Sequence, residues 1–288
     1  MYILINLLIL AIILFCYIHI YYHIKTSNYL EVYEVENLSK EKFEELCELK
    51  QPLIINNVSI LKDITIDSIN SNFSSFDIKI VNRDKSDMYL PIKYGTAIDL
   101  FDKDISSVYV SENNKDFLEE TSLVKEFHTN DLFLRPYNVS NIDYDIIMGS
   151  VNSYTLLKYS LDNRNFFNVL SGSIEVTLCP PKNYKYLYVN NDYENFEFKS
   201  SVDIHNVQDT YRNDFEKVKL LRIVLEPNRL LQIPAYWFYS IKLLEENTLV
   251  SSFRYRTYMS SVSILPQLFV KFLQNQNIKR NITKIAEL

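Results

Sequence analysis

The sequence predicts a mainly β domain of the jelly-roll class, with flanking helices and a transmembrane helix at its N-terminus. Short apolar strands separated by turn residues recur between Ile146 and Tyr258, and repeated short strands with few helices between them are typical of a jelly roll. Helical patterns lie on both sides of this region. Residues 2–22 form an apolar run, and no charged residue precedes Lys25. A helix of that length spans about 30 Å, the thickness of a bilayer's hydrocarbon core.

Composition and charge limit the classes of function. The chain has 288 residues, 47% of them hydrophobic and 14% aromatic, which is enough for a sizeable core in one large domain or two small ones. A formal net charge of −6 and the lack of a basic stripe exclude nucleic acid as a partner. With only three glycines, a glycine-rich phosphate loop is excluded. Cys16, Cys47 and Cys179 form neither a disulfide framework nor a CxxC motif.

Residues 1–24 are predicted to be a retained membrane anchor. A cleaved signal peptide is the alternative, but the apolar run is long, has no charged start and is followed by no small-residue cleavage site. Two orientations stay open. Lys25 directly after the helix favours a cytosolic body. Glycosylation sequons would be usable only in a lumen, and they occur at Asn37, Asn57, Asn72, Asn138 and Asn281.

We expect a linker over residues 25–37, the main domain over 38–260 and a C-terminal helical segment over 261–288. Ser39 can cap a helix that runs to about Lys50, with Leu38 and Phe43 as its hydrophobic staple. Before the β region, the patterns predict strands over 53–55, 77–81 and 107–111, and helices over 95–101 and 115–127.

Two stretches organise the β region. Residues 165–170 and 174–178 are interpreted as a hairpin with its turn at 171–173, because a Gly turn joins two strands and Pro180-Pro181 stops the second. Residues 231–241 are interpreted as one aromatic strand deep in the core, since it is apolar on both faces. Further strands are predicted over 146–148, 153–159, 184–188, 219–225 and 248–258, followed by one or two amphipathic helices over 263–288.

Both stretches also carry a resemblance. Asn165-Phe166-Phe167, the Gly172 turn and Leu178-Cys179-Pro180-Pro181, followed downstream by Ile233-Pro234-Ala235-Tyr236-Trp237, are similar to the JmjC and cupin-like family, closest to its asparaginyl-hydroxylase branch. The resemblance covers about residues 38–258 and implies a double-stranded β-helix. Active members are iron(II) and 2-oxoglutarate dependent oxygenases, which hold iron with a His-x-Asp motif and a distal His.

The residues that would carry this chemistry are replaced here. With one inserted residue, Lys158 and Ser160 fall on the His and Asp positions; without it, Tyr159 and Leu161 do. Neither register supplies a pair of metal ligands. The distal His position is Tyr239, whose phenol is a poor replacement for imidazole.

Two further expectations follow from the resemblance. Ile174 stands at the position where this branch carries a cosubstrate-binding Lys, so no 2-oxoglutarate site is expected. The Lys158 ammonium is expected to pair with nearby Asp162 and to occupy the metal position with a salt bridge.

The histidine content, considered without the resemblance, also argues against an iron site. Of four histidines, only His128 and His205 lie outside the N-terminal apolar region. His128 is interpreted as the end of a helix, where a His near the last carbonyls is common. His205 alternates with Asp203 as a metal-binding strand would, but the pair lacks a third ligand. The other acids that an atypical metal site could recruit are Asp162, Glu226, Glu245 and Glu246.

The sequence therefore predicts a membrane-anchored, catalytically degenerate JmjC/cupin-like pseudoenzyme without cofactor, acting as a binding or structural module. The alternatives are an oxygenase with atypical iron ligands and a jelly roll that binds a sugar or another small molecule. Residues 236–239 are interpreted as core, and Tyr184, Tyr186 and Tyr188 as one face of a strand. A protein partner and a homodimer are expected, the latter through the apolar side of the C-terminal segment, with Leu268, Phe269, Phe272 and Leu273.

Overall fold

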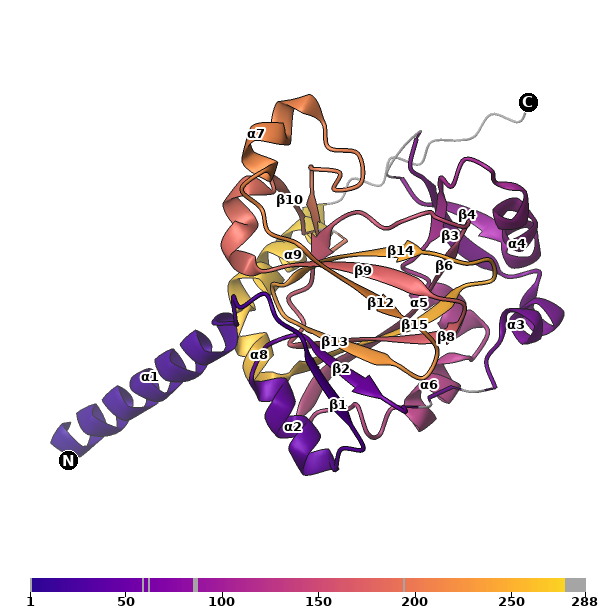
Figure 1. Cartoon of the computed structure of the whole chain (residues 1–288). Coiled ribbons are helices and arrows are strands. Elements are labelled where there is room, and N and C mark those ends of the chain that lie inside the picture. Colours follow the sequence, from indigo (N-terminus) through magenta and orange to yellow (C-terminus); the bar gives the residue numbers. More distant parts are fainter. Residues whose placement is uncertain (1, 59, 62, 85–87, 194, 278–288) are drawn as a thin grey trace.

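Two β-sheets packed face to face form the body of the molecule (Figure 1). The protein is described from a computed structural model over residues 2–58, 60–61, 63–84, 88–193 and 195–277. Within these residues the first sheet has nine strands, in the order β1 (Tyr33–Glu36), β2 (Leu53–Asn56), β13 (Leu230–Pro234), β8 (Arg164–Ser171), β15 (Leu249–Thr257), β6 (Val139–Gly149), β5 (Tyr109–Ser111), β3 (Asp77–Asn82) and β4 (Leu90–Lys93).

The second sheet has six strands within the same residues. Their order is β10 (Val189–Asp192), β11 (Glu197–Ser200), β7 (Lys158–Tyr159), β14 (Phe238–Leu243), β9 (Ile174–Cys179) and β12 (Leu221–Leu225). Every strand pair in the described residues is antiparallel except β1 with β2. An apolar core lies between the sheets, where Phe167, Leu231 and Val250 of the first meet Val176 and Ile241 of the second. Inner faces that interdigitate in this way are typical of a jelly roll.

Helices cover the outer face of the first sheet and extend from both ends of the chain. A second core forms where α2 to α6 pack against that face. The domain is therefore mixed α/β, with two antiparallel sheets that are consistent with the predicted jelly roll. The helical elements are α1 (Tyr2–Ile24), α2 (Lys40–Glu48), α3 (Ile66–Phe73), α4 (Tyr94–Lys103), α5 (Lys115–Glu120), α6 (Val124–Asn130), η1 (Pro181–Tyr186), η2 (Asp209–Tyr211), α7 (Arg212–Phe215), α8 (Tyr258–Ser263) and α9 (Leu265–Asn277).

The predicted hairpin is wrong, although its two strands and its turn are correct. β8 pairs with β13 and β15 in the first sheet, whereas β9 pairs with β12 and β14 in the second. The turn at Gly172 therefore carries the chain from one sheet to the other. Gly172 has a φ of +69°, and a Cβ there would lie 2.2 Å from the Oγ1 atom of Thr248. Apolar alternation cannot separate two strands of a hairpin from two strands that face each other across a core.

The predicted single strand over 231–241 is also wrong. β13 ends at Pro234 in the first sheet, and β14 begins at Phe238 in the second. Tyr236, between them, adopts the left-handed backbone conformation with a φ of +66°. The turn lacks the Gly or Asn that normally marks such a conformation, so the apolar run conceals it. Trp237 and Tyr239 are buried as predicted.

Two smaller predictions also need correction. The helix predicted over 115–127 is divided into α5 and α6, with Ser122 at a φ of +60° between them. The strand predicted over 184–188 is the end of η1, a 3₁₀ helix that stops at Tyr186, and the two residues after it; β10 begins only at Val189. The three tyrosines at 184, 186 and 188 therefore do not share a strand face. The three cysteines are unpaired, as predicted.

The N-terminal helix α1 has a mean hydropathy of 2.8 over its most apolar window, and none of that window is buried. Figure 1 shows it extending away from the body, with its C-terminal end close to α8. An exposed apolar helix at this place is consistent with a membrane anchor or a signal sequence. Residues 25–37, predicted as a linker, contain β1. The predicted cap at Ser39 is confirmed, because its side chain accepts a hydrogen bond from the backbone N–H of Lys42.

Candidate functional site

The centre of the candidate site is the pairing of β7 with β14. In this register Lys158 lies opposite Tyr239, and Tyr159 lies opposite Phe238. In the register with one inserted residue, two of the positions that the resemblance assigns to metal ligands are thus neighbours across two strands. Ser160 follows β7 directly. Together with Asp162 and Arg254, these residues line a cavity of about 280 Å³.

Lys158 forms a buried ion pair with Glu112, which lies in the loop after β5. The Lys158 Nζ atom is 2.6 Å from the Glu112 Oε2 atom, and the Glu112 side chain is 0% exposed. The other carboxylate oxygen of Glu112 accepts hydrogen bonds from the Tyr89 hydroxyl at 2.8 Å and from the Arg83 Nη2 atom at 3.3 Å. The predicted pairing of Lys158 with Asp162 is therefore wrong, because Glu112 reaches the barrel from a distant loop.

Electrostatics reinforce this pairing. Burial raises the pKa of the Glu112 carboxyl, but the positive charges of Lys158, Arg83 and Lys199 outweigh burial and hold that pKa well below its usual range. Burial lowers the pKa of Lys158, and the Glu112 carboxylate outweighs it, so the pKa of Lys158 is raised. Both groups are therefore charged at neutral pH.

The remaining carboxylates around the cavity are each matched by a cation. Asp162 accepts hydrogen bonds from the Nε and Nη2 atoms of Arg256 at 2.9 and 2.7 Å, and from the Ser160 hydroxyl at 3.0 Å. Asp143 forms a salt bridge with Arg254. Ser160 and Asp162 are thus occupied by each other and by Arg256 rather than available as an open ligand pair.

An iron centre of the facial type needs three neutral or anionic ligands that converge on one ion. The positions in question offer an ammonium, a hydroxyl and a phenol, and burial raises the pKa of the Tyr239 phenol further. Over the described parts of the chain, no group of three or more His, Cys, Asp or Glu side chains could hold a metal. Ile174 packs in the apolar core between the sheets and offers no charge to a cosubstrate carboxylate. The residues at these positions therefore do not fit a facial iron centre, and Ile174 does not supply the charge that would bind 2-oxoglutarate.

A comparison with known protein families agrees with the two-sheet architecture. Residues 70–260, more than half of the 288-residue chain, match the family model described as a cupin-like domain. The chain belongs to the cupin-like domain family. No curated protein matches the chain. The two facing sheets and the site between them lie mostly within the matched residues of this cupin-like domain.

The candidate histidines of the cupin-like domain do not approach this site as ligands. Asp203 accepts hydrogen bonds from the backbone N–H of His205 at 2.9 Å and from the Tyr154 hydroxyl at 2.7 Å. The His205 ring lies 4.1 Å from the Tyr154 ring and its Nε2 atom is 3.3 Å from the Ser240 hydroxyl. The Asp-x-His pattern is thus a turn that fixes its own backbone. His128 lies in the last turn of α6, as predicted.

The other acidic candidates occupy turns between strands. Glu226 follows β12, while Glu245 and Glu246 follow β14. Glu245 accepts a hydrogen bond from the Ser173 hydroxyl at 2.6 Å, which joins two of these turns. The structure does not bring these three residues together with Lys158.

Sequence reasoning missed the groups that define the site. Glu112, Arg83 and Tyr89 lie in loops, strand ends and irregular segments, with no motif to mark them. Arg254 and Arg256 carried a weak signal, since two arginines alternate on one strand inside an apolar pattern. An alternating pair of cations on a core strand indicates carboxylates nearby, because a buried charge requires a partner.

Proposed function

We propose that this protein is a membrane-anchored cupin-like module whose catalytic centre is degenerate and which acts by binding. One observation carries the proposal. The Lys158 ammonium, ion-paired with the buried Glu112, stands where a metal ligand stands in active relatives of the resembling family. A positive charge at this place repels a divalent cation, and Glu112 is already neutralised by the protein's own cation.

The polar contacts around this pair support a structural role for it. A buried ion pair is costly to desolvate unless further hydrogen bonds satisfy its remaining atoms. Tyr89 and Arg83 supply such bonds to Glu112. The pair therefore closes the barrel centre with a fixed arrangement, and it leaves the outer surfaces of the domain as the places where a partner binds.

We also propose that α1 spans a membrane. None of its most apolar 18-residue stretch is buried against the described residues, and Lys25 follows the helix directly. A helix with this length and exposure is stable only where its side chains leave water. Carbonate extraction of the full-length protein should leave it in the membrane pellet, and release into the supernatant would refute the anchor.

We propose that the protein forms a homodimer through α9. Phe269, Phe272 and Leu273 are exposed on α9, whereas Leu268 packs against the cluster formed by Leu161 and Phe198. Leu268 is therefore part of the fold rather than of a dimer surface. In full-length protein, Phe269→Ser with Phe272→Ser should convert the dimer to a monomer in light scattering. An unchanged mass would count against this surface.

The catalytic part of the proposal is tested by metal analysis. Full-length protein, purified without chelators, should contain no stoichiometric iron. Adding iron(II), manganese(II) or 2-oxoglutarate should leave its melting temperature unchanged. The measurement is sensitive, because a ligand that binds and is present at about a hundred times its Kd would stabilise the fold by about 2.7 kcal/mol. About one iron per chain would overturn the proposal and support an oxygenase with atypical ligands.

A further inference from the structure

A second cavity lies beside the point where α1 joins the body. It has a volume of about 520 Å³, and four tyrosines line it: Tyr159, Tyr184, Tyr193 and Tyr236. We call it the tyrosine cavity. It contains none of Lys158, Ser160 or Tyr239. Neighbouring residues of a strand point to opposite sides. Lys158 of β7 lines only the cavity of about 280 Å³, whereas Tyr159 lines both cavities.

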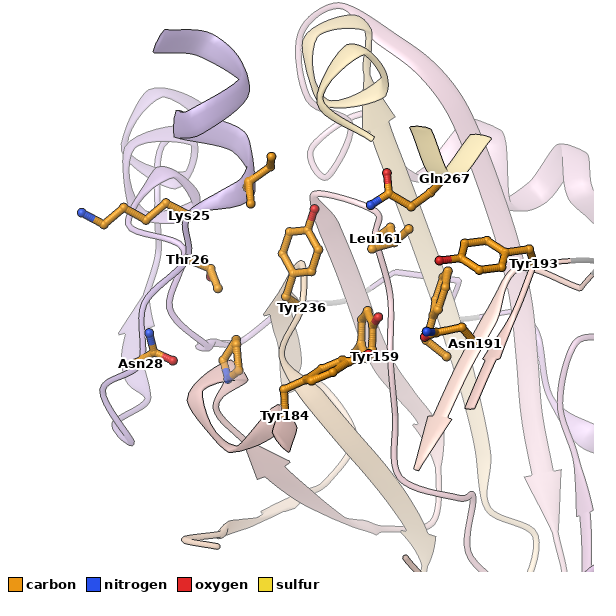
Figure 2. Close-up of a pocket in the computed structure, with 13 residues that line it drawn as sticks. Lys25, Thr26, Asn28, Tyr159, Leu161, Tyr184, Asn191, Tyr193, Tyr236 and Gln267 are labelled. Atoms are coloured by element: carbon orange, nitrogen blue, oxygen red, sulfur yellow. The ribbon is translucent and has the colours of Figure 1, made fainter. Parts of the chain in front are cut away.

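The walls of the tyrosine cavity come from segments far apart in the sequence. Figure 2 shows Tyr159, Tyr184 and Tyr236 gathered on one side, and Tyr193 with Asn191 on the other. The ring of Tyr159 stacks on Phe198 at a centroid distance of 5.0 Å and an interplanar angle of 19°. The rings of Tyr184 and Tyr236 each lie 6.2 Å from it. These contacts hold the wall in place before any ligand arrives.

Tyr236 is held at the cavity by an unusual backbone conformation. Its φ of +66° is rare for an aromatic residue, and its N–H donates to the carbonyl oxygen of Ser160 at 2.9 Å. Local strain of this kind concentrates at functional sites. The Tyr236 hydroxyl has no hydrogen-bond partner among the residues that the structure describes, and burial raises the pKa of its phenol. It is therefore a neutral group that can donate and accept.

The chemistry of the lining residues limits the class of ligand that the cavity can bind. No Asp, Glu or Arg lines this cavity in the described residues, and the ammonium of Lys25, its one lining cation there, points away from it in Figure 2. A metal ion would lack carboxylates and a phosphate would lack cations. Phenols with the amides of Asn191 and Gln267 suit a neutral ligand that has many hydroxyls and an apolar ring face.

We propose that the tyrosine cavity binds a neutral saccharide. Its volume lies within the range of about 300–1,000 Å³ that is typical of small-molecule sites. Two sources share this chemistry, a soluble glycan and the sugar headgroup of a glycolipid. Ile24, the last residue of α1, is part of the lining, so a membrane around α1 would bring its headgroups to the cavity. The inference deepens the proposed binding function, and it rests on the proposed anchor only for the glycolipid source.

The test uses the full-length protein. Its detergent should be a polyoxyethylene rather than a maltoside, because a sugar headgroup would compete for the cavity. The protein is applied to an array of neutral oligosaccharides of glucose, galactose, mannose and N-acetylglucosamine. In parallel it is titrated with phosphatidylcholine nanodiscs that contain or lack glucosylceramide. Array binding indicates a soluble source, and binding only to glucosylceramide nanodiscs indicates the glycolipid.

Two variants assign the binding to this cavity. Tyr236→Gly removes a wall and keeps a backbone that tolerates positive φ, so the fold should survive while binding falls at least tenfold. Asn191→Ala should weaken binding about fivefold by removing an amide. The matched control is Tyr137→Phe, on an exposed tyrosine outside the cavity, and it should bind as the parent does.

The outcomes separate this inference from the proposed function. A folded protein that binds neither the array nor the glucosylceramide nanodiscs overturns the saccharide site. Binding that Tyr236→Gly and Asn191→Ala both leave unchanged overturns its location. Neither result tests the proposed degenerate centre, which is tested by the iron content of the purified protein. A positive iron result would likewise not test saccharide binding in the tyrosine cavity.

Discussion

The two faces of β7 differ in how their polar groups are satisfied. Lys158 and the nearby Asp162 point to charged partners, and each contact is closed within the protein. On the other face, Tyr159 belongs to a neutral aromatic wall where the Tyr236 hydroxyl has no partner in the described part of the chain. A cavity whose charges neutralise one another has few polar groups left for a ligand, whereas the Tyr236 hydroxyl is still able to bind one. The comparison indicates a structural role for the inner face, and it is the outer face at which we propose binding.

Removing one half of the buried ion pair should have the largest effect. Lys158→Ala leaves Glu112 buried with Arg83 and Tyr89 alone, and loss of one partner of a buried pair costs about 3–5 kcal/mol. Urea unfolding of the full-length protein in detergent should show this loss. The matched variant combines Lys158→Met with Glu112→Gln, which removes both charges and should recover most of the stability. A loss below about 1 kcal/mol for Lys158→Ala would contradict a structural role for the pair.

The same pair gives the inner face a pH dependence. The pKa of Glu112 is lowered in the folded state, so its contribution to stability is present above its unfolded value of about 4.3 and is lost as pH falls through the folded pKa. The pKa of Lys158 is raised, so its contribution is present below about 10.4 and is lost as pH rises through the folded pKa. Urea midpoints should therefore fall at acid pH, and the Lys158→Met, Glu112→Gln variant should show a flatter acid limb.

Tyrosine hydroxyls with and without a hydrogen-bond partner should differ by a smaller amount. The Tyr255 hydroxyl donates to the buried carboxylate of Asp131 at 2.8 Å, so Tyr255→Phe should cost about 1–2 kcal/mol of unfolding free energy. Tyr236→Phe removes a hydroxyl without a partner in the described residues and should change stability by less than about 0.5 kcal/mol. Equal losses in urea unfolding would show that the Tyr236 hydroxyl is already engaged, and the outer face would then have no unpaired hydroxyl at this position.

The sequence predicted single elements well and their pairing poorly. Ser39 marked the start of α2, and the alternation of Leu249, Phe253 and Tyr255 marked β15, because caps and periodicity are local signals. The crossing at Gly172 and the turn at Tyr236 were missed. At both places the chain passes from one sheet to the other. The sheet that a strand joins depends on contacts with residues far away in the sequence.

The candidate site divides in the same way. The candidate positions Lys158 and Tyr239 could be identified by resemblance, and the structure places them side by side. Glu112 could not be identified from the sequence, since it binds Lys158 from a loop that is 46 residues away and carries no motif. The tyrosine cavity was also hidden, because Tyr184 and Tyr193 reach it from a 3₁₀ helix and a loop, where side-chain direction has no sequence period. Charge matching between distant loops is a tertiary property.

The smallest effect is expected for a single substitution that asks whether the inner face can bind a metal. Tyr239→His supplies one imidazole, but the opposite position still holds the Lys158 ammonium, and Ser160 offers only a hydroxyl engaged with Asp162. A single ligand beside a fixed cation cannot hold iron(II), so the melting temperature should not change when the metal is added. The matched comparison adds Lys158→His and Ser160→Asp, which restores three ligand types at the same positions. An iron-dependent rise in the single variant would mean that Lys158 can leave Glu112, and the inner face would then be an open site rather than a closed one.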